Sequence, residues 1–140
     1  MDKDKQNRYD NIYLNIANEI SNLSYAKKKK VGALIVKDNM IISDGYNGTP
    51  SNYDNSCEDE NNNTYWYVLH AEANAITKLA RCSTISSKDS TLYITMSPCK
   101  ECSKLIIQSE IKRVIYKEKY RDSSGIDFLK QNNIIIEQLQ

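Results

Sequence analysis

Hydrophobic residues recur at helical spacing near the start of the chain, and two shorter β-rich runs follow them. The apolar helix positions are Tyr9, Ile12, Tyr13, Ile16, Ala17, Ile20 and Leu23. This spacing predicts an amphipathic helix over residues 8–24. The two runs cover residues 31–36 and 40–46 and are joined by the turn-like tripeptide Lys37-Asp38-Asn39. We therefore expect a hairpin of neighbouring strands and a helix that covers the sheet.

The remaining chain alternates between helical and strand-like patterns after a long polar loop at residues 47–64. The expected elements are, in order, a helix at 69–81, a strand at 90–95, a helix opening at Ser97-Pro98, a strand at 112–116, a helix at 125–131 and a strand at 134–136. Strand–helix–strand repeats after a hairpin favour a partly parallel sheet with helices on both faces. The expected fold class is α/β, a three-layer α/β/α domain with a mixed five-stranded sheet, over residues 1–140.

Composition limits the classes of function that this chain can have. Its 140 residues suit one domain, and 40% hydrophobic with 26% charged residues are ordinary values for a globular protein. The N-terminus is polar and no apolar run reaches the roughly 18 residues of a membrane span, so we expect a cytoplasmic protein with no membrane partner. Nineteen basic and 18 acidic residues give a net charge of +1, which favours a small-molecule substrate over nucleic acid.

The chain's one histidine lies in His70-Ala71-Glu72, and Cys99 of the segment Pro98-Cys99-Lys100-Glu101-Cys102 lies 29 residues after it. A catalytic zinc site has three protein ligands and one open position, and His70, Cys99 and Cys102 supply those three ligands. The pattern H-x-E followed by P-C-x-x-C is the signature of zinc deaminases that act on nucleobases. The sequence therefore predicts one catalytic Zn²⁺ per chain, with Glu72 as the catalytic proton carrier.

Other interpretations of these motifs explain them less completely. Two disulfides could in principle use the four cysteines, but C-x-x-C beside H-x-E in a chain without a leader is more typical of a metal site. A structural zinc ribbon needs four ligands from two such pairs, and a thioredoxin-like redox site has no need of H-x-E. In a deaminase, Glu72 would carry the water proton to ring N3 of a cytosine, and the C4 amino group would leave as ammonia.

With these motifs in place, the chain resembles the deoxycytidylate deaminases of the cytidine deaminase superfamily, from Val31 to about Asp122. The segments that carry the resemblance are Val31-Gly32-Ala33, Gly45-Tyr46-Asn47-Gly48-Thr49-Pro50, His70-Ala71-Glu72-Ala73-Asn74-Ala75-Ile76, Ser97-Pro98-Cys99-Lys100-Glu101-Cys102 and Lys104-Leu105-Ile106-Ile107-Gln108. The resemblance implies a cytidine deaminase-like fold. It also implies the zinc-dependent hydrolysis of dCMP to dUMP and ammonia, which feeds dTMP synthesis.

The resemblance also implies substrate contacts. Asn47 would bond the sugar, the backbone around Ala71 and Ser97 would hold the base, and Tyr120 would face the sugar and phosphate. Lys29, in the lysine run 27–30, is a further and weaker candidate for the phosphate, because charge runs usually serve solubility.

A second group of residues is similar to the effector or subunit region of regulated relatives. Its members are Arg81, Tyr46 and Gly48. For Arg81, a helix C-terminal cation that offsets the helix dipole is an equal alternative. The family suggests a homo-oligomer, a hexamer or another closed assembly, with dCTP and dTTP as candidate effectors.

Two departures from the family pattern affect these expectations. Ala26 stands where relatives with a second, structural zinc have a cysteine, and Cys57 alone remains, so we expect no second zinc. The loop from Pro50 to Thr64 is shorter than in several relatives, which leaves effector regulation open. Cys82 is expected to be an ordinary buried or half-buried thiol. The competing functions are another zinc deaminase, acting on cytidine, guanine or tRNA adenosine, and a non-catalytic nucleotide-binding module.

Overall fold

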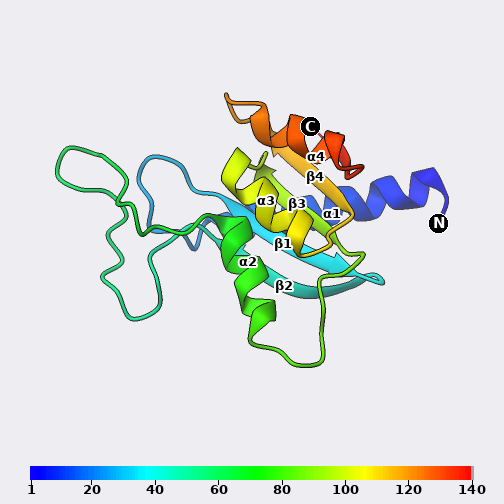
Figure 1. Cartoon of the computed structure of the whole chain (residues 1–140), viewed down its shortest axis with the longest axis horizontal. Helices are drawn as coiled ribbons and strands as arrows, with labels where there is room; N and C mark the ends of the chain where they lie inside the picture. Colours follow the sequence, from blue (N-terminus) through cyan, green and yellow to red (C-terminus); the bar gives the residue numbers. More distant parts are fainter. Residues whose placement is uncertain (140) are drawn as a thin grey trace.

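Four helices and five strands alternate along residues 1–139, the part of the chain that the computed structural model describes (Figure 1). In chain order they are α1 Lys3–Ser21, β1 Gly32–Lys37, β2 Met40–Tyr46, α2 Ala71–Ala80, β3 Thr91–Met96, α3 Lys100–Gln108, β4 Arg113–Glu118, α4 Ser124–Gln131 and β5 Ile135–Gln138. Within these residues every helix is too short or too polar to span a bilayer.

The five strands form one mixed sheet in the order β2-β1-β3-β4-β5. β1 pairs antiparallel with β2 and β3, whereas β4 is parallel to both β3 and β5. Asp38 and Asn39 close the β1–β2 hairpin with φ of 51° and 59°. Two successive positive φ values suit a tight hairpin turn, and Asp and Asn tolerate them well. The predicted hairpin and partly parallel sheet are confirmed.

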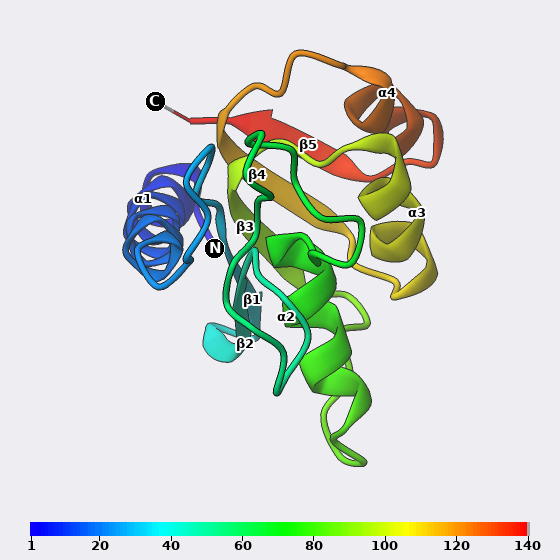
Figure 2. The same ribbon diagram turned by 90° about the vertical axis from the view of Figure 1, so that its left-hand side faces the viewer.

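Helices cover both faces of this sheet, as Figure 2 shows with α1 on one side and α2 and α3 on the other. Tyr13 and Ala17 of α1 pack on one face, in a cluster with Tyr93 of β3. On the opposite face, Ala75 of α2 and Ile106 of α3 belong to the larger core cluster. The predicted three-layer α/β/α fold is confirmed, and the face covered by α2, α3 and α4 is the one that carries the metal motif.

Several predicted boundaries were wrong by a few residues. The first helix runs over Lys3–Ser21 and not 8–24, because Asp2 accepts the Lys5 backbone N–H at 2.8 Å and starts the helix in a polar stretch that has no apolar pattern. The helix predicted from Ser97-Pro98 begins at Lys100. The last strand is Ile135–Gln138 rather than 134–136, since its pairing with β4 extends past the apolar residues.

A buried ion pair fastens α1 to the sheet. Asp10 is fully buried, and its carboxylate accepts bonds from the Arg113 guanidinium and from the Tyr93 hydroxyl at 2.6 Å. Burial alone would raise the pKa of Asp10, but the bonds from Arg113 and Tyr93 outweigh it and hold that pKa below its ordinary value. The charge on this carboxylate is therefore compensated at neutral pH.

Candidate active site

Three metal-binding side chains meet where the N-termini of α2 and α3 lie side by side. His70 Nδ1 lies 3.5 Å from Cys99 Sγ and 3.4 Å from Cys102 Sγ. All three ligand atoms lie within 4.8 Å of one another. Tetrahedral zinc with Zn–N near 2.0–2.1 Å and Zn–S near 2.3 Å requires N···S separations of roughly 3.6 Å. The donor set and spacing therefore fit a zinc ion with these three protein ligands.

Local backbone structure explains why these side chains converge. His70 and Cys99 are the N-cap residues of α2 and α3, and both have an extended backbone. Both residues therefore lie at the N-terminus of a helix, where the helix dipole is positive. The sequence pattern had placed His70 inside the first turn, whereas it precedes that turn by one residue. The Cys99 sulfur accepts the Cys102 backbone N–H at 3.4 Å. Helix N-termini favour thiolates, which are the form that binds zinc.

A glycine of α4 permits close packing on the ligand loop. A Cβ at Gly125 would lie 2.2 Å from the Pro98 carbonyl oxygen and 2.8 Å from the Cys99 carbonyl oxygen. Any other residue would push α4 away from the segment that holds Cys99. The sequence predicted only that Gly125 lies in a helix. Its close approach to Pro98 and Cys99 joins distant segments and therefore leaves no local sequence signal.

The ligand side chains have strongly shifted ionisation in the metal-free chain. The bond from Cys102, together with His70, lowers the pKa of Cys99 to about 3, while the bond to Cys99 and burial raise the pKa of Cys102. The bond to Cys99 also raises the pKa of His70. These shifts favour a Cys99 thiolate beside a protonated Cys102, and zinc binding would displace the remaining protons.

Glu72 lies beside the ligands with only 3% of its surface exposed. Burial raises the pKa of its carboxyl to about 7. A group that exchanges protons near pH 7 is suited to act as both acid and base at that pH. The position predicted from H-x-E is thus occupied by a carboxyl whose environment matches a proton carrier.

A cavity of about 250 Å³ opens above this cluster. It brings together every residue that was expected to touch substrate: Lys29, Asn47, Ala71, Ser97 and Tyr120 line it, as do His70, Glu72 and Cys99. Cys102 is buried at 4% exposure. The expectation of a buried or half-buried Cys82 was wrong, because this thiol follows the end of α2 and is exposed. The volume is slightly below the usual range for small-molecule sites.

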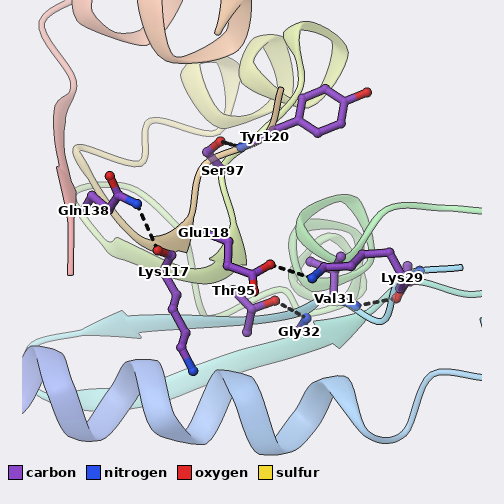
Figure 3. A network of polar contacts seen from close by, with 10 residues as sticks. Lys29, Val31, Gly32, Thr95, Ser97, Lys117, Glu118, Tyr120 and Gln138 are labelled. Carbon is purple, nitrogen blue, oxygen red and sulfur yellow. Dashed lines mark hydrogen bonds and ion pairs between the residues drawn. The ribbon is translucent and has the colours of Figure 1, made fainter. Parts of the chain in front are cut away.

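Two of these residues also hold the cavity walls. The Asn47 side chain accepts the Val31 N–H and donates to the Lys29 carbonyl, both at 2.8 Å. The Ser97 hydroxyl accepts the Tyr120 backbone N–H at 2.7 Å. Figure 3 shows the Ser97–Tyr120 bond and, separately, the Glu118 carboxylate directed toward Lys29. That ion pair measures 2.5 Å, and both side chains are about half exposed.

The residues expected to form an effector or subunit region lie together at a different cavity. Tyr46, Gly48 and Arg81 line a space of about 500 Å³, together with Asn74 and Lys78. It is bounded by the end of β2, the following loop and the outer side of α2.

Sequence reasoning missed several residues of the first cavity. These are Ala26, Lys28, Val31, Cys57, Glu58, Thr64, Val68 and Met96. Glu58 is 6% exposed although it lies in a polar stretch where most neighbours are exposed. The string Cys57-Glu58-Asp59-Glu60 gives no periodic signal that could have separated Glu58 from the other two acids.

Comparison with known proteins places this geometry in a family. Residues 7–118 match the model for the cytidine and deoxycytidylate deaminase zinc-binding region. The chain is 42% identical to a probable deoxycytidylate deaminase of Caenorhabditis elegans over 112 residues, 76% of this chain and 55% of that protein. It is 32% identical to the deoxycytidylate deaminase of Saccharomyces cerevisiae over 140 residues, 93% of this chain and 44% of that protein. The chain thus spans about half the length of these curated relatives.

A solved structure matches the whole length. The dCMP deaminase of the cyanophage S-TIM5, in complex with dCMP and dUMP, is 41% identical, covers 99% of both chains and superposes with a TM-score of 0.91. This likeness covers the fold of the whole chain, and the family model covers residues 7–118. The chain belongs to the cytidine and deoxycytidylate deaminase family, whose shared feature is this zinc-binding region.

Proposed function

We propose that this chain hydrolyses dCMP to dUMP and ammonia. The observation that carries the proposal is the buried Glu72 carboxyl, which lines the first cavity next to a three-ligand zinc cluster. The likeness to a cyanophage enzyme bound to dCMP and dUMP supports the choice of substrate. A protein that only binds nucleotides gains nothing from a proton carrier at this position.

The residues divide the work of the reaction between them. Zinc, when bound by His70, Cys99 and Cys102, supplies Lewis acidity that lowers the pKa of water toward neutrality. Glu72 accepts a proton from the attacking water and donates it to ring N3, which makes C4 of the cytosine electrophilic. Glu72 next accepts the proton of the new hydroxyl on C4 and donates it to the amino group. The C4–N bond then breaks, which releases ammonia and leaves the C4 carbonyl of dUMP. The balance is dCMP plus water to dUMP plus ammonia.

The cavity walls supply the binding groups in this proposal. Asn47 fixes the wall on the sugar side and the backbone at Ala71 and Ser97 holds the base. Tyr120 covers the sugar and phosphate. Lys29 lies at the wall with Lys28, and two cations at one wall suit a phosphate.

The second cavity supports a proposal about regulation. Lys78 and Arg81 lie among its lining residues, and Lys78 is paired with Asp44 at 2.6 Å. We therefore assign Arg81 to the phosphate of an effector such as dCTP or dTTP. We further propose a closed homo-oligomer, because Trp66, 93% exposed, and Tyr53, 59% exposed, are of the type enriched at protein interfaces. A cytoplasmic location stays a prediction from the sequence.

A substrate panel tests the proposal. Zinc-quantified protein is incubated separately with dCMP, CMP, deoxycytidine and dCTP, with and without dCTP or dTTP as added effectors, and ammonia release is followed. We expect dCMP to give the highest kcat/KM. Turnover of CMP or deoxycytidine in preference to dCMP would reassign the substrate, and the absence of ammonia with every compound would refute the deaminase proposal.

A further inference from the structure

The segment between α1 and β1 forms one wall of the first cavity, although it has neither helical nor strand structure. It contains four consecutive lysines, Lys27 to Lys30, and two of them, Lys28 and Lys29, line the cavity. Four adjacent like charges repel one another, and a backbone without regular structure must find other partners for its N–H groups. The wall therefore depends on side chains that reach it from elsewhere in the chain.

Glu58 supplies the buried part of that support. Its Oε2 accepts the backbone N–H groups of Lys27 at 3.0 Å and Lys28 at 3.3 Å. Successive N–H groups that converge on one point form an anion-binding concavity, and here the anion is a carboxylate of the same protein. Hydrogen bonds to a charged acceptor are roughly twice as strong as neutral ones. Glu58 also brings a negative charge to the backbone of the lysine run.

The rest of the wall is held by weaker or more exposed contacts. Asn47 bonds the backbone at Lys29 and Val31 with a neutral amide, and Glu118 pairs with the Lys29 side chain at the surface. Exposed ion pairs contribute little to stability. Glu58 is 6% exposed, and its backbone forms a β-bridge with Thr64, which also lines the cavity.

We propose that Glu58 is a positioning residue for anionic substrates: by holding the backbone of Lys27 and Lys28, it sets the place of the Lys28 and Lys29 side chains that receive the substrate phosphate. This inference rests on the proposed function, since it names how that site selects a nucleoside monophosphate over a nucleoside. His70, Glu72, Cys99 and Cys102 come from α2, α3 and their caps, so the chemistry of the site does not depend on this contact.

The test compares Glu58→Ala and Glu58→Gln with Glu60→Ala, a matched removal of an exposed acid from the same loop. KM and kcat are measured for dCMP and for deoxycytidine, with zinc content as a control. For Glu58→Ala we expect the KM for dCMP to rise about tenfold, which is the effect of losing one charge-assisted hydrogen bond. Its kcat and its KM for deoxycytidine should stay within about twofold of wild type. Glu58→Gln keeps an acceptor oxygen and should lie between wild type and Glu58→Ala.

A double-mutant comparison separates positioning from general stability. In a Lys28→Ala/Lys29→Ala background, Glu58→Ala should raise the KM for dCMP by less than twofold, because the side chains it positions are gone. The proposal is overturned if Glu58→Ala matches Glu60→Ala, if it changes the KM for dCMP and for deoxycytidine equally, or if its effect persists in that background.

If Glu58→Ala does not fold, the same three comparisons are made with Glu58→Gln. For this variant we expect a rise of about threefold in KM, confined to dCMP. Failure of the proposed function can be told apart from failure of this inference, because the wild-type protein would then release no ammonia from dCMP.

Discussion

Replacing Glu72 with Gln should have opposite effects on activity and on the stability of the metal-free chain. Gln keeps the size of the side chain but cannot carry a proton, so kcat for dCMP should fall about 10²- to 10⁴-fold, the usual contribution of general acid–base catalysis. Zinc content should stay at the wild-type level, because His70, Cys99 and Cys102 are unchanged.

The stability effect follows from the raised pKa of Glu72, about 7 in the folded metal-free chain against an ordinary value of 4.5. The folded carboxyl retains its proton to a higher pH, so stability is fully present below pH 4.5 and is lost as pH rises through 7. The pKa difference corresponds to on the order of 3 kcal/mol above pH 7. Metal-free Glu72→Gln should therefore be more stable than wild type at pH 8 by on the order of 3 kcal/mol, and about equal to it at pH 4.

Urea unfolding of both metal-free proteins at the two pH values measures this difference, and ammonia release measures the activity. The reasoning would be refuted by a Glu72→Gln protein that keeps more than about a tenth of wild-type kcat, since such a variant still transfers protons efficiently. Equal stability of the two proteins at pH 8 would refute the claim that an uncompensated carboxylate is buried at this position.

Three further perturbations have expected outcomes. Asp10→Asn leaves the Arg113 guanidinium without its buried partner and should lower the free energy of unfolding by about 3–5 kcal/mol, measured in urea at pH 7. Because the pKa of Asp10 is lowered, the stability difference between variant and wild type should shrink as pH falls through that pKa. A Cβ at Gly45 would lie 2.4 Å from the Ala71 carbonyl oxygen, so Gly45→Ala should displace the start of α2, cost about 1–3 kcal/mol and weaken zinc retention under a competing chelator. Cys99→Ser should lower bound zinc, measured by atomic absorption, well below one per chain, whereas retention of full zinc would remove Cys99 from the ligand set.

The layers of the fold could be predicted from the sequence because their signals are local. Period-two and helical patterns, the Asp38-Asn39 turn and the order of elements are enough to specify a hairpin followed by strand–helix–strand repeats. The helix starts were less accurate, since a cap such as Asp2 depends on one hydrogen bond and not on an apolar pattern.

The metal centre could be predicted because its ligands carry distinctive chemistry at a short spacing within each motif. The contacts that hold the cavity wall in place could not be predicted, although several of the residues that line it were. Glu58 and Lys28 are 30 residues apart and meet through one side-chain-to-backbone contact, and Gly125 meets Pro98 from another helix. Such contacts depend on how distant segments pack, which no short window of sequence describes.

The most direct test of the account is a stoichiometric measurement of the reaction. Zinc-loaded and metal-free wild-type protein are each incubated with dCMP, and dUMP and ammonia are quantified in the same samples. We expect one dUMP and one ammonia for each dCMP consumed by the zinc-loaded protein, loss of turnover on zinc removal, and recovery when zinc is restored. Unchanged dCMP in the presence of one bound zinc per chain would show that this site does not deaminate dCMP.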